Sequence, residues 1–414
     1  MATFLKLAPS THRVFSSGFY PDPDLDFEVR CLLGYAPYGG SDIGEVLKTI
    51  DGVPPGDREH WFRAWHDTAS RVRTMAEAAA MAGQKLTASL AYLRSASYFA
   101  VALNAASCLG DDAPVLPTFR RHRSSWDGFI DTTPHAVEKL DLPYEEGTLP
   151  AWFFRPSAEP SRRRTLVMVN GSDGAISSLW SSGAAGGLAR GYNVLIFDGP
   201  GQQSMLYERG IGFRSDWEAV LTPIVDLLLT REDVDPDRLA LYGVSQGGFW
   251  VPRTVAYEHR FAAAIADPGV KNVSDIWLRH LPGHLKSLFR AGRKDAFDRA
   301  MTLGMRFSSQ NRRTWSFRAR PFRKEGYFDT LDEVSRYVLT HEECAKITTP
   351  LLITDPEDEQ FWPGQSKELA RHVHGPVEVI PFTAAEGANF HCQPLARQLT
   401  DARMFDWLDR TLSR

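Results

Sequence analysis

The sequence predicts an α/β fold in which a mostly parallel sheet follows a helical region and is interrupted by a helical insertion. Three observations support this fold class. Up to about residue 130, apolar positions recur at spacings of three and four, as in packed helices. From about residue 135, short β-like runs alternate with helical runs, which indicates parallel strands. Roughly 80 residues then separate two of the strands, far more than an ordinary connection.

Composition and charge narrow the class of protein. The 414 residues are 43% hydrophobic and 24% charged, as in a globular protein with a substantial core. The net charge of −4 and the isoelectric point near 6.3 do not favour a nucleic-acid partner. No run of 18 apolar residues predicts a membrane span, and residues 1–13 lack the apolar segment of a signal peptide. We expect a cytoplasmic protein that does not bind a membrane.

The cysteines predict neither a metal site nor a disulfide framework. Cys31, Cys108, Cys344 and Cys392 are widely scattered, without the spacing of metal ligands or of a small disulfide-rich domain. The helical region also lacks a Gly-rich phosphate-binding motif. We therefore expect reduced cysteines, no metal and no cofactor.

The sequence pattern of the N-terminal region, residues 1–134, predicts a bundle of helices. Ser41 is a candidate N-cap for a helix over 41–50. A longer helix is expected over 58–82, where Trp61 and Trp65 begin a stripe of apolar residues and Gly83 is a plausible end. Another is expected over 86–109. The apolar stripes are interpreted as core between packed helices rather than as a cofactor site.

The remaining chain divides into a sheet domain in two parts and an insertion. We expect the first part over 135–270, the insertion over 271–346 and the second part over 347–414. Helices are expected at 177–190, 216–230 and 395–412, and the insertion is interpreted as a helical lid near the strand ends. The expected strands are 136–142, 149–155, 165–170, 192–197, 239–242, 262–266, 351–354 and 377–381.

A candidate nucleophile follows the strand expected at 239–242. The chain there reads Gly243-Val244-Ser245-Gln246-Gly247, which is G-x-S-x-G after a strand and before an apolar, helix-like run. Such a motif presents a serine on a tight strand-to-helix turn, where its hydroxyl stands clear of the sheet. The glycines leave room for that turn. Ser245 is therefore the predicted nucleophile.

The candidate acid lies after the strand expected at 351–354. A serine nucleophile needs a base and a carboxylate that orients the base, and on this kind of fold the chain order is serine, acid, histidine. The prolines Pro350 and Pro363 place the usual position of the acid on Glu359. The neighbouring Asp358 is the alternative, because aspartate is the commoner residue type at this position.

The candidate base is His391, which lies between the last expected strand and the final helix. A lone histidine is more often structural, but this position in the chain order favours a catalytic role. The oxyanion hole requires two backbone N–H groups. One is expected from Gln246, directly after the nucleophile, and the other from Ser172 or Asp173 in the loop after the strand at 165–170.

These residues together resemble the α/β-hydrolase superfamily over residues 135–414. The helical N-terminal region, the run Phe-Asp-Gly-Pro-Gly-Gln at 197–202 and Gly-Val-Ser-Gln-Gly-Gly at 243–248 are similar to one group within it. That group contains the dihydroxypseudooxynicotine hydrolases, the fungal polyketide-shortening hydrolases of pigment synthesis and the FrsA-like esterases. Glu359 would depart from the aspartate usual in the superfamily.

The resemblance implies a Ser-acid-His triad, a helical region that covers the site and a homodimer. In part of the group the reaction is hydrolysis of a carbon–carbon bond next to a carbonyl, in a β-diketone or aryl ketone. A small, flat and partly apolar substrate is expected, with Trp277 and Trp362 as candidate contacts and Asp275 as a candidate acid on the far side of the pocket. Two alternatives remain: a carboxylesterase or thioesterase, and a non-hydrolytic lyase, cyclase or binding scaffold.

Overall fold

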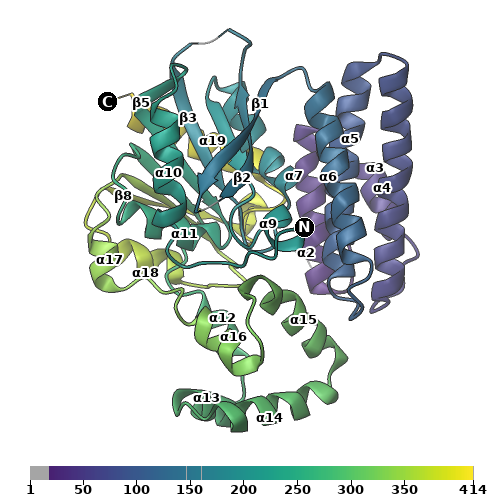
Figure 1. Cartoon of the computed structure of the whole chain (residues 1–414), viewed down its shortest axis with the longest axis vertical. Coiled ribbons are helices and arrows are strands. Elements are labelled where there is room, and N and C mark those ends of the chain that lie inside the picture. The colour runs from purple at the N-terminus through teal and green to yellow at the C-terminus, as the bar shows by residue number, and fades with distance from the viewer. Residues whose placement is uncertain (1–17, 146, 160, 414) are drawn as a thin grey trace, which may run out of the picture.

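A computed structural model of the chain describes residues 18–145, 147–159 and 161–413. Its centre is one sheet in the order β1-β2-β4-β3-β5-β6-β7-β8 (Figure 1). The strand β2 pairs antiparallel with β1 and β4, and the other neighbours pair in parallel. The strands are β1 (Ala136–Tyr144), β2 (Gly147–Arg155), β3 (Arg163–Val169), β4 (Asn193–Phe197), β5 (Val234–Val244), β6 (Ala263–Asp267), β7 (Leu351–Pro356) and β8 (Val377–Phe382). All eight strands predicted from the sequence are therefore confirmed.

Helices cover both faces of the sheet because successive side chains of each strand point to opposite faces. On β3 and β5, Val167 and Leu241 join one core cluster, while Met168 and Tyr242 join the other. The first cluster lies under α10 (Glu218–Leu229), α11 (Gly247–Val255) and α18 (Gln365–His372). The second lies under α7 (Ile176–Leu179), α8 (Ala185–Ala189) and α19 (Arg397–Leu412). The short helix α9 (Gln203–Tyr207) follows β4.

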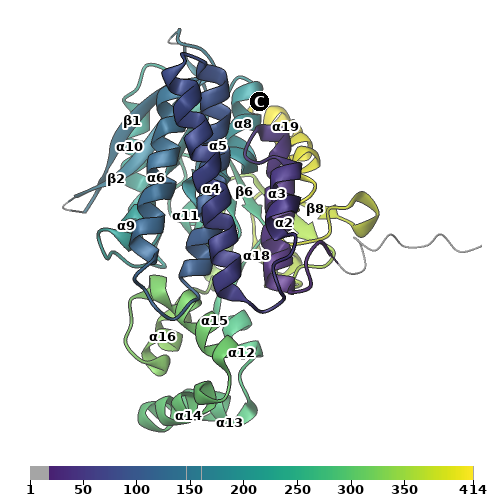
Figure 2. The ribbon, with the colours of Figure 1, turned by 90° about the vertical axis from the view of Figure 1, so that its right-hand side faces the viewer.

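The N-terminal helices stand side by side along one flank of the sheet domain (Figures 1 and 2). On the longest of them, Trp61, Trp65 and Val72 are fully buried, which confirms that the apolar stripe is core. Residues from two of these helices, Leu93 and Trp126, join the second cluster of the sheet domain. The helices are α2 (Pro23–Tyr35), α3 (Ile43–Ile50), α4 (Arg58–Met81), α5 (Lys85–Ala106) and α6 (Val115–Thr132). The part of the predicted region over 1–17, including the segment tested for a signal peptide, lies outside the described residues.

Two local predictions were wrong. Asp42, not Ser41, caps α3: its side chain accepts a hydrogen bond from the Glu45 amide at 3.1 Å. The Ser41 hydroxyl instead donates to the carbonyl oxygen of Leu32. The single helix expected at 177–190 is also divided, because a wider π turn over 180–184 separates α7 from α8.

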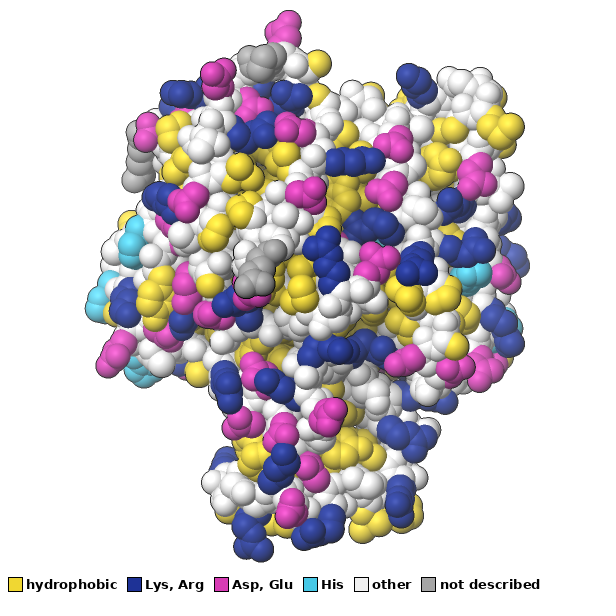
Figure 3. Space-filling view, viewed as in Figure 1, with side chains coloured by type: hydrophobic (Ala, Val, Ile, Leu, Met, Phe, Trp, Pro, Cys, Tyr) yellow, Lys and Arg dark blue, Asp and Glu magenta, His cyan; other side chains and the backbone are white. Residues whose placement is uncertain are grey.

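The chain between β6 and β7 is helical and projects from one end of the molecule (Figures 1 and 3). It has a small core of its own around Leu285, Phe297 and Leu331. The helix α15 carries Arg318, which pairs with Asp173 of the sheet domain at 3.0 Å. The helices are α12 (Ser274–Arg279), α13 (Gly283–Arg290), α14 (Lys294–Arg306), α15 (Ser309–Ala319), α16 (Tyr327–Val334) and α17 (His341–Ala345).

On the face shown in Figure 3, acidic and basic side chains are interspersed. Within the described ranges, none of the helices has both the length and the apolar character needed to cross a bilayer.

Candidate active site

Ser245 occupies a tight turn between β5 and α11. Its φ of 57° lies in the left-handed region, which is uncommon for a residue with a side chain. Its amide donates to the carbonyl oxygen of Asp267 at 2.6 Å. A Cβ at Gly243 would lie 2.2 Å from the Gly247 carbonyl oxygen, and one at Gly248 would lie 1.8 Å from that of Pro268. The glycines therefore permit a turn that no bulkier residue could share.

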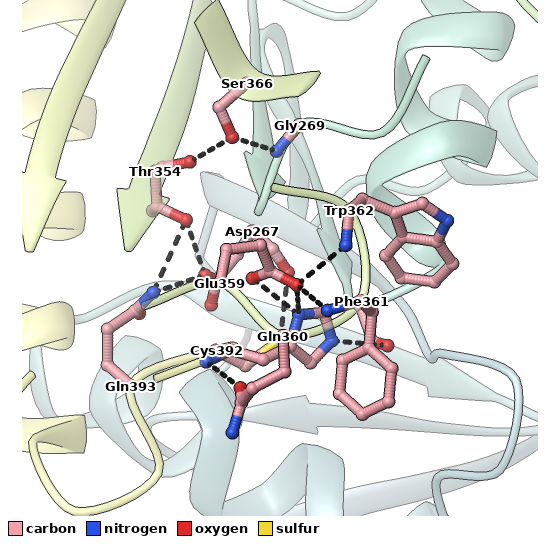
Figure 4. Close-up of polar contacts among 12 residues, drawn as sticks. Asp267, Gly269, Thr354, Glu359, Gln360, Phe361, Trp362, Ser366, Cys392 and Gln393 are labelled. Carbon is pink, nitrogen blue, oxygen red and sulfur yellow. Dashed lines mark hydrogen bonds and ion pairs between the residues drawn. The ribbon is translucent and has the colours of Figure 1, made fainter. Parts of the chain in front are cut away.

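A continuous chain of hydrogen bonds joins Ser245, His391 and Glu359. His391 Nε2 lies 2.8 Å from Ser245 Oγ, and His391 Nδ1 lies 2.9 Å from each Glu359 carboxylate oxygen. Glu359 is itself held in place, because its Oε1 accepts from the amides of Phe361 at 2.9 Å and Trp362 at 3.2 Å (Figure 4). These are the contacts that a nucleophile, a base and an orienting acid require.

Electrostatics keep Glu359 ionised beside the imidazole. Burial alone raises the pKa of its carboxyl, but the charge of His391 and the hydrogen bonds from His391, Phe361 and Trp362 outweigh burial. The pKa of Glu359 therefore lies below its usual value. A carboxylate at this position favours the tautomer with the proton on Nδ1, which leaves Nε2 free to accept the Ser245 proton.

The structure shows which of the two candidate acids, Glu359 or Asp358, contacts His391. Asp358 points to a different partner, since its Oδ2 accepts from Asn389 Nδ2 at 2.6 Å and its amide donates to the Asn389 carbonyl oxygen. Only Glu359 of this pair reaches His391. The next residue, Gln360, accepts from the His391 amide at 3.0 Å and so helps to fix the histidine loop.

A buried carboxylate, Asp267, ties the strand ends beneath the site to that loop. It accepts from the hydroxyls of Tyr242 at 2.9 Å and Thr354 at 2.6 Å, and from Gln393 Nε2 at 3.0 Å. Arg397 pairs with it at 3.2 Å, and both side chains are at most 2% exposed. Figure 4 shows the contacts of Asp267, Thr354 and Gln393. This network fixes the segment that carries His391 relative to the turn at Ser245.

The loop expected to complete the oxyanion hole lies beside Ser245. A Cβ at Gly171 would lie 2.7 Å from the Ser245 Cβ. The Gly171 amide donates to its neighbour Asn170 at 2.9 Å, whereas within the described chain no acceptor contacts the amides of Gln246, Ser172 or Asp173. The amides predicted as oxyanion donors are therefore not engaged by the protein.

The motif at 197–202 supports that loop. Gln202 Nε2 donates to the carbonyl oxygens of Asn170 at 2.9 Å and Gly171 at 3.1 Å. The Gln202 side-chain oxygen in turn accepts from the Gly199 amide at 3.1 Å. The motif was noted in the sequence, but this function of Gln202 was missed because it depends on a loop about 30 residues away in the chain.

Comparisons with known proteins are consistent with this geometry. The family model described as "Alpha/beta hydrolase family" matches residues 166–397. The chain belongs to the alpha/beta hydrolase family. It is 28% identical to "Hydrolase LUC6" of Fusarium sp, over 97% of this chain and 98% of that protein. It is 32% identical to "20-hydroxy-prefusarin hydrolase FUS2" of Gibberella moniliformis, over 66% of this chain and 65% of that one.

The fold of this hydrolase also matches a solved structure over nearly its whole length. The crystal structure of the 2,6-dihydroxy-pseudo-oxynicotine hydrolase superposes with a TM-score of 0.72 over 92% of this chain and 95% of that one, at 19% identity. The fold class and the resemblance predicted from the sequence are thereby confirmed, and the chain is an enzyme of the hydrolase class.

A cavity of about 490 Å³ opens at Ser245 and His391 in the hydrolase. The predicted oxyanion-hole residues Ser172 and Asp173 and the predicted substrate contact Trp362 line it. Its wall is built from the sheet domain, from α2 and α5 of the N-terminal region and from α15 of the insertion. The N-terminal helices therefore contribute directly to the space beside Ser245.

Two of the predicted substrate contacts do not line this cavity. Asp275 is held on α12 by Asn272 Nδ2 at 2.9 Å and Gln365 Nε2 at 2.7 Å. Trp277 packs edge-on against Trp315, with ring centroids 5.0 Å apart. Aromatic richness suggested a substrate contact, but this aromatic residue packs inside the insertion.

Proposed function

We propose that this hydrolase uses Ser245 as a nucleophile, His391 as the base and Glu359 as the orienting acid. The observation that carries the proposal is the unbroken contact from Ser245 Oγ through His391 to Glu359. In this proposal His391 accepts the hydroxyl proton as Ser245 attacks a substrate carbonyl carbon. The amides of Gln246 and of Ser172 or Asp173 stabilise the oxyanion.

The reaction then proceeds through an acyl-enzyme. When the tetrahedral intermediate collapses, the leaving group departs and takes the proton from His391 Nε2. Water, deprotonated by the same nitrogen, next attacks the acyl carbon and releases the acid together with free Ser245. For an ester the leaving group is an alkoxide. For a β-diketone the leaving group is an enolate, because the second carbonyl delocalises the electron pair of the broken carbon–carbon bond.

We further propose that the substrate is a β-diketone, aryl ketone or polyketide-like compound cleaved at a carbon–carbon bond. The resemblance to the polyketide-shortening hydrolases and the similarity to the 20-hydroxy-prefusarin hydrolase support this substrate class. The volume of the cavity, about 490 Å³, suits a molecule of moderate size. Carboxylester or thioester hydrolysis is the second candidate, since the same triad would perform it.

The experiment compares purified wild type with Ser245→Ala on two substrates, a short-chain aryl ester and an aromatic β-diketone. Cleavage of either substrate by the wild type, with a loss of roughly 10⁴-fold or more in Ser245→Ala, supports the nucleophile. Ser335→Ala is the control, because that hydroxyl, at the C-terminal end of α16 in the insertion, donates only to the backbone oxygen of Leu331 among the described residues. Equal rates in wild type and Ser245→Ala would contradict the mechanism and favour a lyase, cyclase or binding scaffold.

We make two further proposals, one about the roles of the two helical regions and one about the oligomeric state and location of the protein. Residues 1–134 act as a cap and 271–346 as a lid, since α2, α5 and α15 all contribute to the cavity wall. The protein is a homodimer, as the resemblance implies, and it is cytoplasmic, as the scattered cysteines suggest. Light scattering tests the second proposal directly: a mass of one 46.3 kDa chain would rule out the dimer.

A further inference from the structure

Arg318 on α15 connects the helical insertion to the loop that is proposed to complete the oxyanion hole. Its Nη1 donates to Asp173 Oδ2 at 3.0 Å, and both residues line the cavity at Ser245. One face of α15 is turned toward that cavity, because its lining residues recur in pairs four residues apart. They are Ser309, Gln310, Arg313, Thr314, Phe317 and Arg318. The insertion therefore brings a charged side chain into the wall of the site.

The two ends of this loop are held by the sheet domain, but its tip, residues 172–173, is not. Gln202 holds the start of the loop through two carbonyl oxygens. Gln203 holds its end, because the Nε2 of Gln203 donates to the Gly174 carbonyl oxygen at 3.3 Å. Within the described chain, the only hydrogen bond that joins the tip to another segment comes from Arg318. The direction of the two tip amides therefore depends on a residue of the insertion.

Arg318 also contacts the segment that carries the acid. Its guanidinium carbon lies 5.6 Å from the centroid of the Phe361 ring, a distance at which a cation is attracted to an aromatic ring. That ring packs edge-on against the His391 ring, with centroids 4.6 Å apart. The Phe361 amide donates to Glu359 at 2.9 Å. One side chain of the insertion thus contacts both the oxyanion loop and a residue that packs on the histidine and holds the acid.

The ion pair between Arg318 and Asp173 is weak enough to be removed without unfolding the chain. The two side chains are each 36% exposed. Ion pairs at such positions add little to the stability of a fold, and dissolved salt screens them. We therefore expect removal of the pair to change the position of the loop tip and to leave the fold intact.

We propose that Arg318 is a positioning residue for the reaction. It holds Asp173 so that the amide of Ser172 or Asp173 faces the oxyanion that forms when Ser245 attacks a carbonyl. The insertion thereby stabilises the transition state, so that loss of Arg318 lowers kcat and leaves KM nearly unchanged. This inference rests on the proposed function and adds a residue of the insertion to it.

The test measures how tightly the site holds an oxyanion. The probe is trifluoroacetophenone, an electrophilic ketone that an activated serine attacks reversibly to give a hemiketal oxyanion. Its Kd is measured by fluorine NMR on wild type, Arg318→Ala, Asp173→Asn and the double variant. We expect each single variant to raise Kd about fivefold, the upper end of what a partly exposed ion pair supplies. The double variant should also raise Kd about fivefold, because both substitutions remove the same interaction.

Kinetics and salt dependence separate positioning from a merely structural role. With phenyl acetate, Arg318→Ala should lower kcat about fivefold and keep KM within about twofold, since acylation and deacylation both pass through an oxyanion. Arg318→Lys, which keeps the charge, should recover most of the loss. At about 1 M salt, which screens the pair, wild type and Arg318→Ala should differ less than about twofold. Lys294→Ala is the control, because it breaks an exposed pair with Asp329 inside the insertion, and its kcat should match wild type.

The outcomes distinguish this inference from the proposed function. An adduct on wild type whose Kd is unchanged in Arg318→Ala, an equal loss in Lys294→Ala, or losses that multiply in the double variant would overturn the positioning role and leave the nucleophile intact. No adduct on wild type, or an equal adduct on Ser245→Ala, would overturn the nucleophile and this inference with it. Near-ultraviolet circular dichroism shows whether each variant is folded. Asp173→Asn leaves the insertion unchanged, so it tests the pair even if Arg318→Ala does not fold.

Discussion

Replacing Glu359 with glutamine keeps the shape of the side chain and removes its charge. In the native protein, both carboxylate oxygens lie 2.9 Å from His391 Nδ1, and the two side chains are 5% and 3% exposed. The amide of the variant would present an N–H to Nδ1. It would thereby favour the wrong tautomer, with the proton on Nε2, where the nitrogen cannot accept the Ser245 proton.

The expected loss follows from the charge interaction that disappears. Unit charges about 4 Å apart interact by about 4 kcal/mol at the effective dielectric constant of about 20 that suits such sites. This interaction stabilises the imidazolium only when it forms during the reaction, so it lowers the barrier. At about 1.4 kcal/mol per tenfold in rate, Glu359→Gln should lower kcat about a thousandfold.

The assay is steady-state hydrolysis of an aryl ester by Glu359→Gln, Asp358→Asn and wild type. Asp358→Asn is the matched control, because it makes the same chemical change one residue away on a carboxylate that bonds to Asn389. We expect its kcat to stay within about threefold of wild type, since it lies outside the triad contacts. A large loss in Asp358→Asn with a small one in Glu359→Gln would refute the assignment of the acid.

Three further predictions concern the turn, the buried ion pair and Glu28. Gly171→Ala should lower kcat/KM about a hundredfold in the same assay, because its Cβ would lie 2.7 Å from that of Ser245 and displace the nucleophile; an unchanged rate would contradict the contact. Arg397→Met should lower the free energy of unfolding by about 3 kcal/mol or more, since Asp267 stays buried without its cation; denaturant titration with an unchanged midpoint would refute this. Glu28→Gln should become more stable relative to wild type as pH rises from about 4.5 to about 8, and no further. In wild type the folded carboxyl, with its pKa raised to about 8, retains a proton that the unfolded carboxyl releases, so wild type loses stability over this range. A pH-independent difference in denaturation midpoint would count against the raised pKa.

The sequence allowed prediction of the sheet and of the three residues that meet at its edge. This was possible because the loops after parallel strands lie at one edge, so their order along the chain fixes their neighbours. Ser245 and His391 could be placed from their positions in that order. Glu359 and Asp358 could not be separated fully, because adjacent loop residues point in different directions that depend on contacts such as the one with Asn389.

The far side of the cavity could not be predicted. Glu28 and Asn104 carry no motif, and they reach the site only because the N-terminal helices pack along the flank of the sheet domain (Figure 2). The opposite error arose at Trp277, whose ring was expected at the substrate but packs against Trp315. Composition shows that a segment is rich in aromatic residues, whereas packing decides which rings face a cavity.

The most direct test of the account is covalent labelling of the nucleophile. Wild type and Ser245→Ala are each incubated with a fluorophosphonate, which reacts with activated serines, and then measured by intact-mass spectrometry and peptide mapping. The account predicts one phosphonate adduct on wild type, located at Ser245, and none on the variant. An adduct at a different serine, or equal labelling of both proteins, would contradict the claim that Ser245 is the activated nucleophile.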